Sequence, residues 1–285
     1  MLSEKKVREL EEFALRIRLE TLKELGGLGF GHLGGAMSAV ETLAVLYGEV
    51  MNIDPSNPGW EERDWFICSK GHAGPAVYAA LALRGFFPVE ELATLNRPGT
   101  KLPSHCDRNR TRGVDMTTGS LGQGVSSAVG VALGNRMDGR KNRIYLMAGD
   151  GELQEGQVWE AALFAAHRKL DNLIAFVDNN KQQLDGFTKD INDVGDIKSK
   201  FESFGWKALE ADGADIPAIY EAVAKAGEAA GKPSVIVLHT VKGKGCSFAE
   251  GTPDNHHMVF KEGQMAPEIA RLEEELQRLR KAVTV

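Results

Sequence analysis

Cysteine is scarce in this sequence, and long apolar runs are missing. The 285 residues include three cysteines, Cys68, Cys106 and Cys246, which form no C-x-x-C pair. Neither a disulfide framework nor a structural zinc site is therefore expected. No apolar stretch approaches the roughly 18 residues that a membrane-spanning helix needs, and the first 17 residues mix both charges, unlike a signal peptide. We expect a cytoplasmic protein with no membrane partner.

An excess of basic charge is also absent. The sequence has 34 basic and 40 acidic residues, a net charge of −6 with neutral histidines. Because phosphate neutralisation needs a basic face, nucleic acid is not an expected partner. Glycine, in contrast, is abundant at 32 residues, about 11% against a usual ~7%. These glycines cluster between apolar segments, where they indicate backbone that approaches something closely.

Apolar segments of helical and strand type alternate along the chain. Helical spacing occurs at 4–24, 38–50, 121–137, 157–170, 197–204, 216–230 and 266–282. Short apolar runs of strand type occur at 64–68, 143–147, 172–177, 207–211 and 234–239. This alternation predicts an α/β fold with a mostly parallel central sheet and helices on both faces. Since no repeat or linker is visible, we expect a single domain over 1–285.

Two segments stand outside this alternation. Residues 86–118 show little periodicity, and long irregular stretches inside compact domains are usually functional. The last helix, 266–282, carries an apolar stripe too short for a free coiled coil. We expect it to pack on the body of the protein or on a partner.

The first glycine cluster matches a dinucleotide-binding fingerprint by letter, as Gly29-x-Gly31-x-x-Gly34. That motif must leave a strand and open a helix. Here a predicted helix precedes it, and no strand ends before Gly29. A nicotinamide or flavin site is therefore not expected.

A second cluster, Gly149-Asp150-Gly151, directly follows a predicted strand, and Asn180 follows the next strand. Parallel strands deliver their carboxyl ends to one edge of the sheet, where ligands bind. Carboxylate and amide oxygens suit Mg²⁺ or Ca²⁺ rather than zinc. One carboxylate alone binds a metal weakly, so these residues predict a metal shared with a diphosphate. The glycines would let backbone N–H groups approach the phosphates.

The spacing GDG, 27 residues, then NN resembles the thiamine diphosphate signature. The surrounding GDGELQEGQVWEAALFAAHRKLDNLIAFVDNNKQQLDG is similar to transketolase. Further similar segments follow the same order: GHLGGAMS, SKGHAGPAVYA, LPSH, TTGSLGQGVSSAVG and KGKG. A full-length transketolase has two further domains that no segment matches. The chain therefore resembles the N-terminal, diphosphate-binding subunit of a split-gene transketolase.

The resemblance implies a set of site residues. Asp150 and Asn180 match metal ligands through their side chains, and Gln182 through its backbone carbonyl. The positions that match cofactor contacts are His72, Gly119, Leu121, Asp150, Gly151, Asn180 and Lys242. The implied catalytic residues are His32, which assists proton transfer, His105, which contacts the donor's first hydroxyl, and His257, a further substrate histidine. Glu155 matches an acid that joins the two cofactor sites. In the segment His256-His257-Met258 the family has WHG or VHG, which leaves the choice between the two histidines open.

The resemblance also implies an activity and a partner. It implies transfer of a two-carbon ketol unit from a ketose phosphate to an aldose phosphate through thiamine diphosphate and Mg²⁺ (or Ca²⁺), as in the pentose phosphate pathway. The glutamate that activates the cofactor lies on the missing second domain, so we expect an α2β2 heterotetramer with a C-terminal subunit.

Two alternatives remain open. A 1-deoxyxylulose-5-phosphate synthase-like enzyme shares the GDG and NN frame but differs around ELQEGQVWEA. A non-catalytic partner protein of the same fold is the second alternative, although the presence of Asp150, Asn180 and the histidines argues against it.

Overall fold

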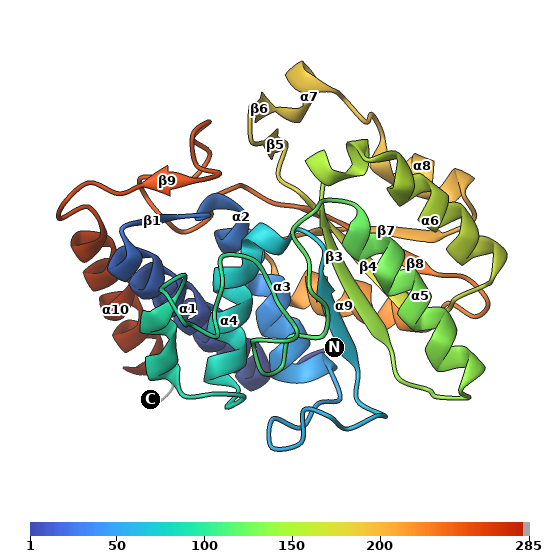
Figure 1. Cartoon of the computed structure of the whole chain (residues 1–285), viewed down its shortest axis with the longest axis horizontal. Helices are drawn as coiled ribbons and strands as arrows, with labels where there is room; N and C mark the ends of the chain where they lie inside the picture. The colour runs from blue at the N-terminus through green and yellow to red at the C-terminus, as the bar shows by residue number, and fades with distance from the viewer. Residues whose placement is uncertain (282–285) are drawn as a thin grey trace.

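The computed structural model describes residues 1–281 and is built around a five-stranded parallel sheet (Figure 1). In sheet order the strands are β2 (Trp65–Cys68), β3 (Ile144–Gly149), β4 (Leu173–Asn179), β8 (Ser234–His239) and β7 (Lys207–Asp212). Every neighbouring pair is parallel. The predicted α/β class and all five predicted strands are confirmed.

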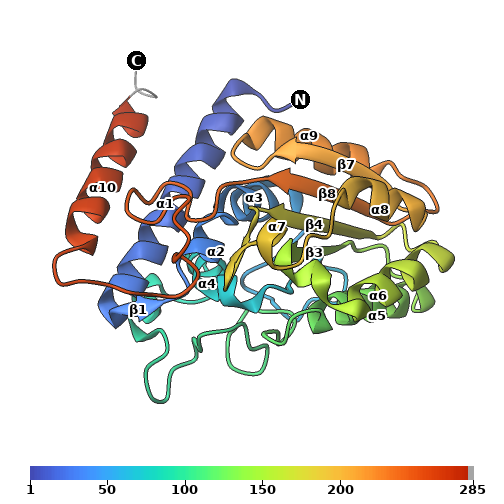
Figure 2. The same cartoon turned by 90° about the horizontal axis from the view of Figure 1, so that it is seen from above.

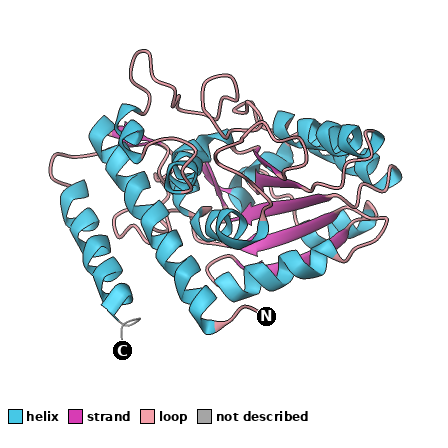
Figure 3. Ribbon diagram, turned by 90° about the horizontal axis from the view of Figure 1, so that it is seen from below, coloured by secondary structure: helices cyan, strands magenta, loops and turns pink. Residues whose placement is uncertain are grey.

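Helices cover both faces of this sheet (Figure 3). One layer contains α1 (Glu4–Leu28), α3 (Val40–Val45), α4 (Gly74–Leu83) and α9 (Ile216–Gly227). The other contains α5 (Gln123–Met137), α6 (Gly156–His167) and α8 (Ile197–Ser203). Side chains of β3 alternate between the layers, Tyr145 toward the first and Leu146 toward the second. Because both faces are covered, the strand is apolar throughout.

The helix expected over 38–50 is wrong in its extent. The structure has α2 (Gly34–Met37), then α3, and then one turn of π-helix, η1 (Leu46–Val50). The interruption falls at Ser38, whose hydroxyl donates to Asp178 at 2.7 Å and lies 3.3 Å from the carbonyl oxygen of Gly34. A short polar side chain that bonds nearby groups competes with regular helix geometry.

The loops at the carboxyl edge contain short elements that the sequence did not predict. β1 (Phe30–Gly31) pairs with β9 (Met258–Val259), and β5 (Gln182–Gln183) pairs with β6 (Gly186–Phe187). The remaining short elements are η2 (Gly71–Ala73), η3 (Val89–Thr94), η4 (Gly151–Gln154) and α7 (Thr188–Ile191). Strands of two residues are too short to show a sequence period. Residues 86–118 are otherwise irregular, as expected.

The last helix, α10 (Met265–Lys281), lies alongside α1 (Figure 2). Its Leu272 and Leu276 are buried, so packing on the body of the protein, one of the two expectations, is confirmed. The end of the predicted helix 266–282 lies outside the described residues. None of the helices within residues 1–281 is long and apolar enough to cross a membrane.

Candidate active site

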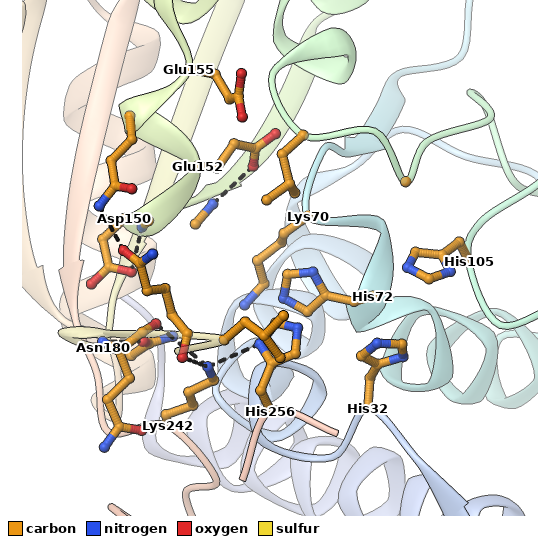
Figure 4. A pocket seen from close by; sticks show the side chains of 18 residues that line it. His32, Lys70, His72, His105, Asp150, Glu152, Glu155, Asn180, Lys242 and His256 are labelled. Carbon is orange, nitrogen blue, oxygen red and sulfur yellow. Dashed lines mark hydrogen bonds between the residues drawn. The ribbon is translucent and has the colours of Figure 1, made fainter. Parts of the chain in front are cut away.

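A cavity of about 290 Å³ opens at the carboxyl edge of the sheet, beyond β3 and β4 (Figure 4). Gly149 pairs with Asp178 across these parallel strands, so the chain delivers Asp150 and Asn180 to the same edge, as predicted. The predicted site residues that line the cavity are His32, His72, His105, Gly119, Leu121, Asp150, Gly151, Glu155, Asn180, Gln182 and Lys242. The structure therefore brings together every predicted site residue except His257.

Of the two histidines between which the sequence left the choice open, His256 lines the cavity and His257 does not. The Nδ1 of His256 lies 3.1 Å from Lys242 Nζ, whereas His257 is exposed and absent from the lining. The preceding Asn255 fixes this arrangement. Its buried side chain donates to two backbone carbonyls, and its own carbonyl accepts from the N–H of Gly34. The exposed ring of His257 nevertheless lies beside the site, with its centroid 4.9 Å from that of His32.

The glycine loops around the cavity pack too closely for side chains. A Cβ atom at Gly35 would lie 2.7 Å from His72 Nε2, and one at Gly71 would lie 2.8 Å from the backbone N of Gly119. At Gly151 a Cβ would lie 2.8 Å from Gln183 Cβ. Contacts this short require backbone without side chains, the close approach that the glycine clusters predicted.

Three hard oxygen groups gather at the ends of β3 and β4. The carboxylate of Asp150 accepts from the backbone N–H of Gly151 at 2.8 Å and of Lys181 at 2.5 Å. Asn180 Oδ1 accepts from the N–H of Gln182 at 3.0 Å. Each oxygen keeps a further lone pair. No cluster of three histidine, cysteine or acidic residues capable of metal binding occurs among residues 1–281. The Asp150 carboxylate, the Asn180 amide oxygen and the backbone carbonyl of Gln182 thus form a set that fits Mg²⁺ or Ca²⁺ with further ligands from phosphate oxygens.

Two buried lysines make the cavity suitable for an anionic group. Lys70 and Lys242 both line it and are 1% and 2% exposed. Burial and the charge of Lys70 lower the pKa of Lys242 to about 8. Burial, and then Asp178, raises the pKa of Asp150 to about 7, so a bound cation would favour its ionised form. Both the lysines and the oxygen set therefore fit a diphosphate with its metal.

Four histidines from separate segments form one wall of the cavity: His32, His72, His105 and His256. The ring centroid of His32 lies 5.1 Å from that of His105 and 5.4 Å from that of His256. Burial and neighbouring charges lower the pKa of His32 to about 4 and of His256 to about 3. Burial also lowers the pKa of His72 and of His105. Neutral imidazoles at pH 7 can both accept and donate at substrate hydroxyl groups.

Sequence reasoning missed two charged residues of the cavity, Lys70 and Glu152. The carboxylate of Glu152 accepts from Ser69 Oγ, from the N–H of Gly122 at 2.8 Å and from that of Gly149 at 3.1 Å. It therefore joins three loops beneath the cavity. Lys70 lies in the segment SKGH and Glu152 in the segment GDGE. Both segments resemble transketolase, and this resemblance was the signal that could have identified the two residues. Their burial depends on packing and is not readable from the motif.

Comparison with known proteins identifies the family. Residues 11–276 match the family profile described as transketolase, thiamine diphosphate binding domain. The chain belongs to the transketolase family. This confirms the resemblance inferred from the motifs, including the expected thiamine diphosphate-binding domain.

Two relatives of similar length are named as transketolase subunits. The chain is 55% identical over 267 residues to 6-deoxy-6-sulfo-D-fructose transketolase subunit SqwG of Clostridium sp. (strain MSTE9), covering 94% of this chain and 97% of the relative. It is 42% identical to an apulose-4-phosphate transketolase subunit of Actinobacillus succinogenes, covering 92% and 94%.

Solved transketolases share this fold in less than half of their own, longer chains. The structure from Campylobacter jejuni superposes with a TM-score of 0.86 at 29% identity, covering 97% of this chain and 43% of the other. The transketolase of Rattus norvegicus is 37% identical, and 39% of its length is covered. This chain therefore corresponds to less than half of a long transketolase but to nearly all of a transketolase subunit.

Proposed function

We propose that this chain is the N-terminal, diphosphate-binding subunit of a two-chain transketolase. It would transfer a two-carbon ketol unit from a ketose donor to an aldose acceptor, with residues 1–285 forming a single thiamine diphosphate-binding domain. The observation that carries the proposal is the cavity, which combines a hard oxygen set, two buried lysines and four neutral histidines. Similarity to named transketolases favours this function over a deoxyxylulose-phosphate synthase or a non-catalytic partner protein.

The cofactor would be held by the groups that the strand ends provide. Asp150, Asn180 and the carbonyl of Gln182 would bind Mg²⁺ (or Ca²⁺), with the diphosphate completing its coordination. The contacts to the cofactor itself would come from His72, Gly119, Leu121, Gly151 and Lys242. When bound, thiamine diphosphate supplies the electron sink that no amino-acid side chain offers for cleavage beside a ketone.

The histidine wall would bind and orient the sugar. His105 would position a hydroxyl of the donor, and His32 would accept or donate a proton at the hydroxyl that becomes the aldehyde. Of the two histidines in the H-H-M segment, His256 has the geometry to join them, because only it lines the cavity. Glu155 is exposed at the rim of the same cavity, where it could act toward a second cofactor site across an assembly.

The names of the two relatives suggest the donor class. One is named for a sulfonated fructose and the other for a sugar phosphate, so both names contain a sugar with an anionic group. We propose a ketose of this kind as the donor. The higher identity to the first relative makes 6-deoxy-6-sulfo-D-fructose the first donor to test, with the sugar phosphates of the pentose phosphate pathway as the competing choice.

The partner would be a C-terminal transketolase subunit that carries pyrimidine-binding and C-terminal domains, in an α2β2 assembly. Support comes from the two relatives, which are themselves named as subunits. In the family the cofactor lies between the two domain types. The partner would then supply the glutamate that activates the cofactor.

The experiment is to purify this chain and the C-terminal transketolase subunit of the same genome separately and to mix them. Ketol transfer is measured with matched donors, 6-deoxy-6-sulfo-D-fructose and D-fructose 6-phosphate, and mass by light scattering. We expect activity only in the mixture, saturating near one partner per chain, with a mass of two copies of each. Ketol transfer by this chain alone, or a mixture that binds thiamine diphosphate but transfers nothing from either donor, would overturn the proposal.

A further inference from the structure

One carboxylate beneath the cavity gathers donors from four segments of the chain. Asp178, near the end of β4, is 0% exposed. Its donors are Ser38 Oγ at 2.7 Å, Asn180 Nδ2 at 2.9 Å, Lys70 Nζ and Thr240 Oγ1. Three of these donors reach Oδ2 and one, Thr240, reaches Oδ1, so the carboxylate is bonded at both of its oxygens.

The four donors fall into two kinds. Ser38 and Thr240 are absent from the lining of the cavity and hold the carboxylate from its other side. Lys70 and Asn180 line the cavity themselves. Asp178 therefore does not line the cavity but is bonded to two groups that do.

The buried lysine has its counter-charge in this carboxylate. Lys70 is 1% exposed, and an ammonium group buried without a counter-charge is strongly unfavourable. Asp178 is the acid that forms an ion pair with it. The pair allows a charged lysine to stand in the cavity wall.

The orientation of Asn180 depends on the same carboxylate. Its Nδ2 donates to Asp178, which leaves Oδ1 as the atom turned away, where it accepts from the N–H of Gln182. The reversed amide would place an oxygen against a carboxylate and an NH₂ group against a backbone N–H. Asp178 thus selects which atom of Asn180 is presented at the end of the strand.

We propose that Asp178 is a positioning residue of the metal and diphosphate site, acting through Lys70 and Asn180. The inference rests on the proposed function, because it requires that this cavity bind Mg²⁺ with thiamine diphosphate. Groups that orient metal ligands from behind typically contribute 10–100-fold to metal affinity.

A matched control exists at the opposite end of the sheet. Asp115 is also a buried, ion-paired carboxylate, 4% exposed, bonded to Arg63 and to the backbone N–H of Phe66 near the start of β2. It does not line the cavity. Its substitution measures what the loss of such an acid does to stability alone.

The test compares the full chain, mixed with its partner subunit, as wild type, Asp178→Asn and Asp115→Asn. Asparagine keeps the shape of the side chain but replaces one acceptor oxygen with an NH₂ group, which cannot accept from a hydroxyl or an ammonium. Isothermal titration measures the Kd of thiamine diphosphate at fixed Mg²⁺ and of Mg²⁺ at fixed cofactor, well below the unfolding midpoint. We expect Asp178→Asn to weaken binding about 10–100-fold. Asp115→Asn should lower Tm and leave both Kd values within about twofold.

If Asp178→Asn does not fold, the double variant Lys70→Met/Asp178→Asn removes both buried charges and is compared with Lys70→Met alone, and the double variant is expected to bind more weakly than that single variant. Binding by an Asp178 variant within twofold of wild type would overturn the inference and assign Asp178 a purely structural role. The two proposals fail differently. A wild-type chain that binds no thiamine diphosphate contradicts the proposed function as well, whereas wild-type binding with unchanged Asp178 variants contradicts the positioning role alone.

Discussion

The two edges of the sheet both contain buried acids, but they use them differently. At the amino edge, Asp64 accepts from the backbone N–H of Asn52 at 2.9 Å and of Arg143 at 2.7 Å, which joins the starts of two strands to a loop. At the carboxyl edge, Asp178 accepts from Lys70 and Asn180, and Glu152 accepts from the N–H of Gly149, all of which line a cavity. Buried acids therefore join backbone segments at the amino edge and contact groups of a cavity wall at the carboxyl edge.

The volume of a hollow does not show which edge of the sheet holds the candidate site. A hollow of about 610 Å³ lies at the amino edge, larger than the 290 Å³ cavity at the carboxyl edge. Its lining holds no histidine, whereas the smaller cavity collects four. The direction of the parallel strands explains this difference, because the loops that follow the strands and begin the helices all meet at the carboxyl edge. Chemistry therefore identifies the site, and volume does not.

The largest expected effect at the carboxyl edge comes from removing the charged group of the proposed metal site. Asp150→Ala deletes the only carboxylate of the proposed oxygen set, so we expect Mg²⁺-dependent binding of thiamine diphosphate to be lost. Far-UV circular dichroism should stay close to wild type, because the substitution lies at a strand end. Isothermal titration with the partner subunit present is the measurement. Undiminished binding would mean that the metal lies elsewhere.

The next largest effect should appear in catalysis without an effect on the cofactor. In His105→Ala an oriented hydrogen bond to the donor is lost, which commonly costs ~2.7–4 kcal/mol, or 10²–10³ in rate. Steady-state kinetics of the two-chain enzyme should show this loss in kcat or in kcat/KM for the donor, while the Kd of thiamine diphosphate is unchanged. The control is His167→Ala, at the exposed end of α6. Wild-type donor kinetics in His105→Ala would remove this residue from the substrate site.

The comparison of edges also explains what the sequence could predict. The strands were predictable because β3 and β4 are apolar on both faces, and Asp150 and Asn180 because each directly follows a strand. The choice between His256 and His257 was not predictable. It depends on Asn255, which contacts Gly34 more than 200 positions earlier in the chain.

The buried acids were missed for a related reason. Asp178 stands one position before the Asn-Asn pair, and nothing in the sequence shows that three distant donors, Ser38, Lys70 and Thr240, converge on it together with the neighbouring Asn180. A charged residue in or beside a loop is usually solvated, so its role follows only from its packing. Local chemical patterns therefore predicted residues that line the cavity, whereas the buried acids behind them became visible only in the fold.

The smallest expected effect is on the pH dependence of folding stability. It too belongs to the carboxyl edge, because the four histidines with lowered pKa values all lie there. For His32, burial and then His105 lower the pKa from 6.5 to about 4. As the pH falls below 6.5 the unfolded chain takes up this proton first, so His32 costs stability increasingly between pH 6.5 and about 4.

His32→Gln should remove that cost. Urea denaturation of the chain at pH 7 and pH 5 should therefore show a gain in the variant's stability relative to wild type at pH 5 compared with pH 7. His167→Gln, at the exposed end of α6, is the matched control. Because Asp150, whose pKa is raised, contributes with the opposite sign over this range, the difference between variant and wild type is the informative quantity. If the difference in stability between variant and wild type is the same at both pH values, His32 has the same pKa in the folded and in the unfolded chain, and this prediction is wrong.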